Sequence, residues 1–313
     1  MSNKAIYKTI CETHSGIPAF LQYWWMDAVC SEWDVAIVYN GDKVSGVWPY
    51  AVENKGGVSI RRSQFLTPYS GPHVFFPHDL KESKRDNFEH ETISALIDKM
   101  PDAKVWHIAL QPALKQAGLF NAGGFDVQVK QTFLMDLQHG IDTVFARLNE
   151  DYRRNIRKAE AELKITDEPQ LLHKLYEFQK ATLNSKDLQV YYSEAQMQQL
   201  FDACRASNST ALWVARKGDA VQAIVWEIWD DECAYYLAGA KNPAEKDNRA
   251  MTALLWHAMK EAMHRGKKTF DFEGSMDAGV EKFFRNFGGT RELYLTIQKN
   301  DSLLWKLKEK LRG

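Results

Sequence analysis

The chain has 313 residues and carries 40 basic against 41 acidic side chains, so its formal net charge is −1. A charge this close to zero excludes tight non-specific binding to nucleic acid through bulk electrostatics. No apolar run is long enough to span a membrane, and residues 1–20 lack the apolar segment of a signal peptide. Four dispersed cysteines without a CxxC pair, and histidines without a close-spaced pair, predict a cytoplasmic protein with reduced thiols and no metal site.

The first half of the chain has the pattern of an α/β domain that contains a β-hairpin. The hairpin turn is Asn40-Gly41-Asp42, and Asn-Gly between two apolar runs is the strongest short-range hairpin signal. In chain order, the pattern predicts a helix over residues 18–30, strands over 33–40, 43–52 and 57–63, a helix over 86–99, a strand over 104–110, a short helix over 112–117 and a strand over 125–136. This order is typical of one mixed sheet flanked by helices.

The second half repeats this arrangement after three opening helices. It predicts helices over residues 141–163, 169–184 and 193–206, strands over 210–217, 220–230 and 232–240, a helix over 249–265, a strand over 269–272, a helix over 275–287, a strand over 291–299 and a basic helix over 302–313. The segments VYNGDKVSGVW and ARKGDAVQAIV align around Gly41 and Gly218. We therefore predict two copies of one α/β unit, with domains at residues 1–136 and 137–313.

Three segments of the second half and one of the first resemble the Gcn5-related N-acyltransferase superfamily, and more closely its FemAB-like branch. They are YRRNIRKAEAELKI at residues 152–165, the strand-helix-strand stretch at 235–275, GVEKFFRNFGG at 279–289 and the loop LTPYSGPHV at 66–74. The resemblance implies two tandem acyltransferase-like domains, each a mixed, mostly antiparallel sheet flanked by helices. It also implies a donor site in the second domain, with acyl-coenzyme A or aminoacyl-tRNA as the donor substrate.

The chain departs from the family pattern at two positions that matter for the donor. The turn KNPAEKDNRAM, residues 241–251, contains no glycine, whereas superfamily members that use coenzyme A have a glycine-rich turn that holds pyrophosphate. Phe284 stands where relatives have a lysine. We therefore expect weak or absent coenzyme A binding, with Lys241, Lys246 or Arg249 as substitutes for the missing backbone amides. The long helical arm of the peptidoglycan-bridge enzymes is also missing, which weakens the argument for a tRNA donor.

Asp271, Glu273 and Lys282 are the predicted catalytic residues. Alternation along the strand predicts that both carboxylates share one face, where either could take a proton from an attacking amine. Lys282 and Arg285 lie three residues apart on the following helix, so together they could hold a phosphate or stabilise an oxyanion. The alternatives are a solvated strand face, a carboxylate paired with Lys282, and ordinary charge on a helix surface.

The predicted substrate-binding residues, besides Arg285, are Tyr69, Arg154, Arg157, Tyr236 and Gly239. Arg154 and Arg157 lie on a basic helix whose like charges four residues apart are unfavourable unless an anion binds there. Tyr69 lies in a proline-fixed loop, and Gly239 would allow a bulge or the close approach of a ligand. We expect Arg154, Arg157, Lys282 and Arg285 to line an electropositive cleft with Tyr69 and Glu273 on its walls; for each residue, simple packing or surface charge is the alternative.

Together these patterns predict transfer of an acyl or aminoacyl group to an amine of an anionic acceptor, such as a cell-envelope or polysaccharide precursor. The acceptor is therefore expected to be a small molecule or a precursor rather than DNA. The alternative is a non-catalytic ligand-binding protein on an acyltransferase fold, which the glycine-free turn and Phe284 favour. The basic segment at residues 302–313 could lie on a membrane surface or dock on its own domain.

Overall fold

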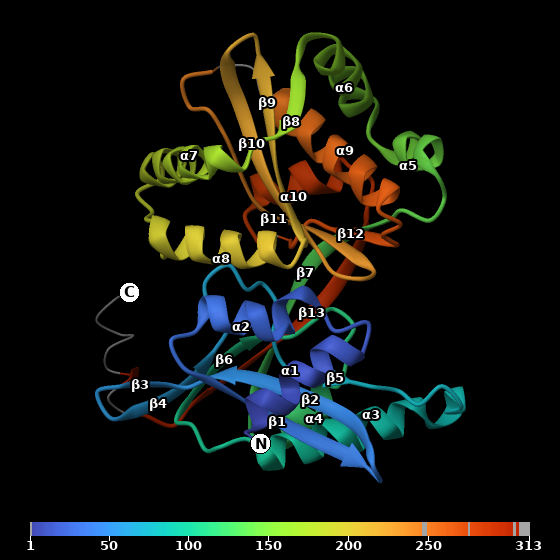
Figure 1. Ribbon diagram of the computed structural model, residues 1–313, viewed down its shortest axis with the longest axis vertical. Coiled ribbons are helices and arrows are strands. Elements are labelled where there is room, and N and C mark those ends of the chain that lie inside the picture. Colours follow the sequence, from blue (N-terminus) through green and yellow to red (C-terminus); the bar gives the residue numbers. More distant parts are fainter. Residues whose placement is uncertain (1, 246–248, 275, 303–304, 307–313) are drawn as a thin grey trace. The chain divides into compact units, whose positions relative to one another are not determined.

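The computed structural model describes residues 2–245, 249–274, 276–302 and 305–306 (Figure 1). It separates into two compact units, one formed by Met1–Lys130 with Leu293–Gly313 and the other by Gln131–Glu292. Two long strands, β7 (Asp126–Asp136) and β13 (Thr290–Asn300), cross from one unit into the other. No helix in the described ranges is long and apolar enough to cross a membrane.

The first unit contains two sheets, with strand orders β1-β2-β5 and β3-β4-β6-β13. Strand β4 is parallel to β6, and β6 is antiparallel to β13. The aromatic core of this unit includes Trp48, Trp106 and Phe120. Its elements are α1 (Asn3–Thr13), the 3-10 helix η1 (Ala19–Leu21), α2 (Tyr23–Val29), β1 (Trp33–Asn40), β2 (Lys43–Ala51), β3 (Glu53–Lys55), β4 (Val58–Arg62), β5 (His73–Val74), α3 (Glu82–Lys99), β6 (Val105–Ala109) and α4 (Ala117–Ala122).

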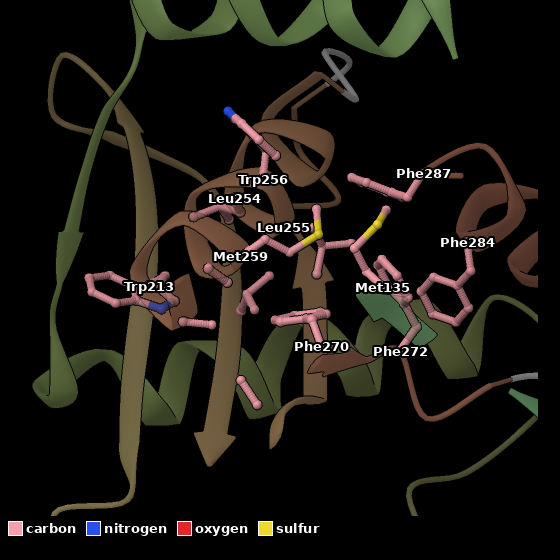
Figure 2. Packing of buried hydrophobic residues seen from close by; sticks show 14 of the residues in the cluster. Met135, Trp213, Leu254, Leu255, Trp256, Met259, Phe270, Phe272, Phe284 and Phe287 are labelled. Atoms are coloured by element: carbon pink, nitrogen blue, oxygen red, sulfur yellow. The ribbon is translucent and has the colours of Figure 1, made fainter. Parts of the chain in front are cut away.

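The second unit has one mixed sheet in the order β7-β12-β11-β10-β9-β8. Strand β11 is parallel to β12, and all other pairs are antiparallel. Its core brings Phe270 and Phe272 against α9 and against Phe284 of α10 (Figure 2). Its elements are α5 (Ile141–Arg147), α6 (Glu150–Glu162), β8 (Lys164–Asp167), the 3-10 helix η2 (Pro169–Leu171), α7 (Leu172–Asn184), α8 (Glu194–Ala206), β9 (Thr210–Lys217), β10 (Ala220–Trp229), β11 (Cys233–Lys241), α9 (Arg249–His264), β12 (Thr269–Asp271) and α10 (Ala278–Arg285).

The two units share one order of elements, as the sequence predicted, although the hairpin of the first unit lies in a different sheet from its parallel strand pair. Each contains an antiparallel hairpin whose turn glycine, Gly41 or Gly218, has a positive φ of 62° or 59°. Each then has a parallel strand pair, β4 with β6 or β11 with β12, followed by an antiparallel last strand. The last strands are exchanged along the chain: β7 pairs with β12, and β13 pairs with β6. This pairing explains why residues 293–313 belong to the first unit.

Helix boundaries differ from the predicted ones where capping side chains intervene. The predicted helix over residues 141–163 is two helices, because the Asn149 side chain accepts a hydrogen bond from the Asp151 amide and starts α6 afresh. The predicted helix over 275–287 begins at Ala278, because the Asp277 side chain caps it. Helix α1, capped by Ser2, was not predicted, and α4 begins where the predicted short helix ends. Most of the predicted basic helix over 302–313 lies outside the described residues.

Candidate active site where strands β11 and β12 part

The sheet of the second unit opens at the ends of β11 and β12. These parallel strands pair only between Cys233–Tyr235 and Thr269–Asp271. Strand β12 then stops, whereas β11 continues to Lys241 with β10 alone beside it among the described strands. The free edge of a strand presents backbone N–H and C=O groups that a ligand can pair with. The part of β11 that follows Tyr235 is therefore a place for an extended or carbonyl-bearing substrate.

A β-bulge shapes this edge. The register between β10 and β11 shifts between Trp226 and Glu227, which leaves Leu237 as the extra residue on β11. The extra residue places Tyr236 and Gly239 on the same face of the strand. A Cβ atom at Gly239 would lie 2.5 Å from the Tyr236 hydroxyl oxygen. The absence of a side chain at Gly239 therefore makes room for the Tyr236 ring, which covers this part of the strand.

Asp271 is a buried carboxylate that organises the end of β12. It accepts hydrogen bonds from the Thr132 hydroxyl and from the backbone amide of Glu273, the latter at 2.7 Å. The predicted strand alternation stops here, because Glu273 lies beyond β12 and has a positive φ of 57°. Asp271 thus positions the backbone of Glu273, and the two carboxylates lie in different environments.

Glu273 carries the chemically distinctive group of this site. Its Oε1 oxygen is shielded from solvent and has no hydrogen-bond partner within the described part of the chain. Burial, and then the nearby Asp271 carboxylate, raise the pKa of Glu273 well above its ordinary value. Gly274 fixes the turn that follows, because it has a φ of 65° and any Cβ there would overlap the Gln131 carbonyl. A raised pKa makes a carboxylate a stronger base once it is ionised, which is the property that a general base needs.

Tyr236 lies close enough to Glu273 for their charges to interact. Burial, and then the Glu273 carboxyl, raise the pKa of the Tyr236 hydroxyl, which therefore keeps its proton at physiological pH. The Tyr236 ring packs against Phe284 of α10, with ring centroids 5.7 Å apart. Phe284 itself is buried, so at this position of α10 the chain supplies packing rather than positive charge.

The two cations predicted on α10 point to solvent. Lys282 and Arg285 are both exposed, and Arg285 lies 3.9 Å from Glu281. In the described ranges Lys282 has no ion-pair partner, so the alternative in which it pairs with Asp271 or Glu273 is not observed. A catalytic role for Lys282 stays a prediction.

Arg154 and Arg157 lie on α6 beside an open hollow of about 530 Å³. Arg154 donates to Asp151 at 2.6 Å, and the Arg157 guanidinium lies 5.4 Å from the Phe145 ring centre. Their neighbour Arg153 is used structurally, because it donates to the Ala146 and Leu148 carbonyls at the end of α5. The hollow is lined by Asp142, Phe145, Ala146, Glu150, Arg153, Arg154 and Arg157, and thus by neither cation of α10.

Tyr69 belongs to the core of the first unit. It is 2% exposed, and its ring makes edge contacts with Phe20 and Tyr294 at 6.0 and 5.2 Å. This environment favours the packing alternative over a pocket wall.

The glycine-free turn after β11 is built by Asn242. Its backbone N–H donates to the Gln222 carbonyl, and its side-chain oxygen accepts from the Ala244 backbone amide at 3.0 Å. Arg249, one predicted substitute for backbone amides, forms an ion pair with Glu162 at 3.2 Å. Lys246, another, lies outside the described residues. The side chain of Asn242 thus holds the start of this turn.

Two polar residues that matter locally were missed from the sequence. Thr132, which holds Asp271, follows a polar stretch and looks like an ordinary strand residue. Glu227 is fully buried on β10 and accepts a hydrogen bond from the Trp213 indole at 2.7 Å. A single charged residue inside the apolar run AVQAIVWEIW was the signal for Glu227.

Residues 146–285 match the family described as Acetyltransferase (GNAT) domain, whereas comparison with curated proteins found no match. Among solved structures, FemX has a TM-score of 0.68 at 12% identity, over 97% of this chain and 98% of that one. The C-terminal domain assigned to a lysylphosphatidylglycerol synthetase of Agrobacterium fabrum has a TM-score of 0.57 at 13% identity, over 98% and 96%. A tandem GNAT protein from the clavulanic acid biosynthesis pathway has a TM-score of 0.52 at 10% identity, over 96% and 94%. At these identities the likeness is one of fold, and it confirms the predicted pair of acyltransferase-like domains.

Proposed function

We propose that the chain transfers an acyl or aminoacyl group to an amine, because residues 146–285 match the family described as Acetyltransferase (GNAT) domain and the two-domain fold is similar to that of FemX. The observation that carries the proposal is the Glu273 carboxylate, which is buried, has no partner for Oε1 in the described chain and lies where β11 and β12 part. Perturbed carboxylates of this kind concentrate at catalytic sites.

The chemistry follows from the positions of the side chains. The donor carbonyl lies along the free edge of β11, and the acceptor amine attacks it directly. The new C–N bond forms as the bond from the carbonyl carbon to the thioester sulfur or ester oxygen of the donor breaks, and the donor leaves as a thiol or hydroxyl with the proton that Glu273 has received. Glu273 takes the proton that the amine loses, while Asp271 and Thr132 hold the backbone of Glu273 in place. The Tyr236 hydroxyl, which keeps its proton, donates a hydrogen bond to the oxygen on which negative charge develops. Holding the two substrates in this geometry supplies much of the remaining rate.

The acceptor is an anionic molecule, which Arg154 and Arg157 on α6 would bind. The Arg157 guanidinium lies over the Phe145 ring, a contact that does not use its N–H groups as hydrogen-bond donors. These N–H groups could therefore donate charge-assisted hydrogen bonds to a carboxylate or phosphate of the acceptor. Cell-envelope and polysaccharide precursors that carry phosphate or carboxylate groups fit this charge. The donor is acyl-coenzyme A or an aminoacyl-tRNA, and the glycine-free turn favours a donor held mainly by its acyl end.

A second candidate function is ligand binding without turnover. It is favoured by Phe284, which is 3% exposed and packs against Phe272 at 5.2 Å, where the family pattern has a lysine. A ligand at 100 times its dissociation constant would stabilise such a protein by about 2.7 kcal/mol without any product being formed.

The test compares Glu273→Gln with wild type in transfer assays that pair each donor class with amine-bearing envelope precursors. Glutamine keeps the shape of the side chain but cannot accept the proton, so kcat is expected to fall by ~10²-fold or more. Glu177→Gln, which changes an exposed carboxylate on α7, is the matched control and is expected to behave as wild type. Full activity in Glu273→Gln would refute Glu273 as the proton acceptor. Ligand-induced stabilisation with no product from any pair would favour the binding protein.

A further inference from the structure

The first unit buries an arginine that forms no ion pair within the described ranges. Arg61 on β4 is 5% exposed, and its Nε–H is shielded from solvent and has no hydrogen-bond partner among the described residues. Its Nη1 group donates to the Ile60 carbonyl at 3.1 Å, and the guanidinium lies 5.1 Å from the centre of the Tyr50 ring. Neither contact supplies a full negative charge, so this buried cation lacks a counter-charge at hydrogen-bond distance.

The carboxylate that acts on Arg61 is already shared with other cations. Burial lowers the pKa of Arg61, and the charge of Glu53 acts in the opposite direction. The Glu53 carboxylate accepts a hydrogen bond from Arg62 Nε at 3.0 Å, and Lys55 Nζ lies 3.6 Å from it. Three cations thus share one carboxylate. Because arginine stays protonated in proteins, this part of the first unit keeps an excess of positive charge.

A small cavity lies beside Arg61. It has a volume of about 20 Å³ and is lined by Trp48 and Tyr50 of β2 and by Arg61 of β4, among others. The equivalent strands of the second unit, β10 and β11, pair with each other, whereas β2 and β4 belong to different sheets and leave this space between them. A cavity of about 10–15 Å³ holds one water molecule, so this one admits a single small group.

The loop that follows β4 supplies a second donor. Ser63 and Ser70 both line the cavity, and their hydroxyl oxygens lie 2.9 Å apart. Ser63 Oγ also accepts a hydrogen bond from the Ala109 backbone amide. Each hydroxyl has one proton and the bond between them uses one. Whichever serine donates, the other proton has no acceptor among the described groups. The cavity is therefore lined by an unsatisfied N–H of a cation and an unsatisfied O–H, and both suit an anion.

The size and the walls of the cavity select the class of anion. Sulfate and phosphate are strongly hydrated ions with four oxygen atoms each, too large for a space that admits one small group. The side chains of Met26, Val29 and Ile108 make part of the lining apolar, which further disfavours an ion that holds its water tightly. A halide is a single atom with one charge and a weaker hydration shell, so it fits both the volume and the walls.

We propose that the first unit binds one chloride ion in the cavity between β2 and β4, held by the Arg61 Nε–H and by the remaining hydroxyl proton of the Ser63–Ser70 pair. The ion supplies the counter-charge that the Arg61 guanidinium lacks. It also ties the loop that begins at Ser63 to β4, because donors from both converge on it. Chloride binding at this place does not depend on the proposed transfer activity.

The experiment follows thermal unfolding of the full chain while sodium chloride replaces sodium gluconate at constant ionic strength. Gluconate is too large for the cavity and serves as the reference anion. The Tm of wild type is expected to rise saturably with chloride, by about 3 °C at ten times the dissociation constant. The line width of the chlorine NMR signal measures binding directly, and it should narrow when bromide is added as a competitor.

Arg61→Met keeps the length of the side chain and removes its charge. This variant should lose the effect of chloride on both Tm and line width. In gluconate it should unfold at the same temperature as wild type or higher, because a buried charge without a counter-charge destabilises the fold. Arg85→Met is the matched control, since Arg85 also lies over an aromatic ring, 3.6 Å from the centre of Phe76, but is exposed. It should keep the full chloride effect.

Two outcomes would overturn the proposal. Equal Tm and equal line width of wild type in chloride and in gluconate would show that the cavity takes water only. A chloride effect of wild-type size in Arg61→Met would place the ion elsewhere in the protein. Ser63→Ala combined with Ser70→Ala keeps the proposal testable if Arg61→Met does not fold. This double variant retains Arg61 and should bind chloride ~10-fold more weakly; unchanged binding would also count against the site.

Discussion

Replacing the buried Glu227 by glutamine is expected to remove the part of the pH dependence of stability that this carboxyl group contributes between pH 5 and 8. Glu227 lies on β10, accepts from the Trp213 indole and has the Arg265 guanidinium 3.6 Å away, beyond hydrogen-bond length. Burial raises its pKa from 4.5 to about 8, although Trp213 and Arg265 both lower it. Desolvation therefore outweighs the favourable contacts in this group.

The sign and size follow from linkage. Because the folded-state pKa is the higher one, the folded protein holds the Glu227 proton more tightly than the unfolded chain. Its contribution is fully present below pH 4.5 and is lost as the pH rises towards 8. One pKa unit corresponds to about 1.4 kcal/mol, so about 3 kcal/mol has been lost by pH 7. The uncharged Glu227→Gln side chain does not titrate and should lack this loss.

The assay is urea denaturation at pH 5, 6.5 and 8, followed by tryptophan fluorescence, since Trp213 and Trp226 lie in the same sheet. Wild type should lose about 3 kcal/mol of unfolding free energy across this range relative to Glu227→Gln. Glu194→Gln, which changes an exposed carboxylate at the start of α8, is the control and should follow wild type. Parallel pH profiles for wild type and Glu227→Gln would refute the assignment of a raised pKa to Glu227.

Two further predictions concern the candidate site. Gly239→Ala should leave the protein folded but lower kcat/KM by ~10-fold or more, because the new methyl group would lie 2.5 Å from the Tyr236 hydroxyl oxygen and displace the ring. Activity equal to that of wild type would show that the position of the Tyr236 ring does not matter for transfer. Calorimetry with acetyl-coenzyme A should give weak or no binding, because the turn that begins at Asn242 has no glycine to bring its amides to a pyrophosphate; a micromolar dissociation constant would contradict this.

The sequence predicted the repeated topology because the signals for it are local. An Asn-Gly or Lys-Gly-Asp turn between apolar runs specifies a hairpin, and both turn glycines have the positive φ that these turns require. The exchange of β7 and β13 was not predictable in this way. It depends on which partner strand each one pairs with, and pairing between distant segments leaves no periodic mark on either strand.

The candidate site was predictable as a set of residues but not as a set of roles. Asp271 and Glu273 were found because they alternate with Phe270 and Phe272. Their separate roles depend on Thr132, which lies far away in the sequence and holds Asp271 by a hydrogen bond. The role of Gly239 likewise depends on the bulge at Leu237, which changes the face on which Tyr236 lies. A count of residues along a strand gives its faces only while the register is regular.

Glu273 combines two features that each oppose folding. Four described residues other than glycine have a positive φ, and of these only Glu273 also buries a carboxylate oxygen that has no partner among the described atoms. A left-handed conformation at such a residue costs of order 1 kcal/mol or more, and a buried unpaired carboxylate adds to this cost. The Asp271 carboxylate increases the electrostatic cost of ionising Glu273, and it also accepts the hydrogen bond that holds the Glu273 backbone in that conformation. This combination of a strained backbone and a buried, unpaired carboxylate oxygen is the reason why we propose Glu273, rather than Asp271, as the proton acceptor.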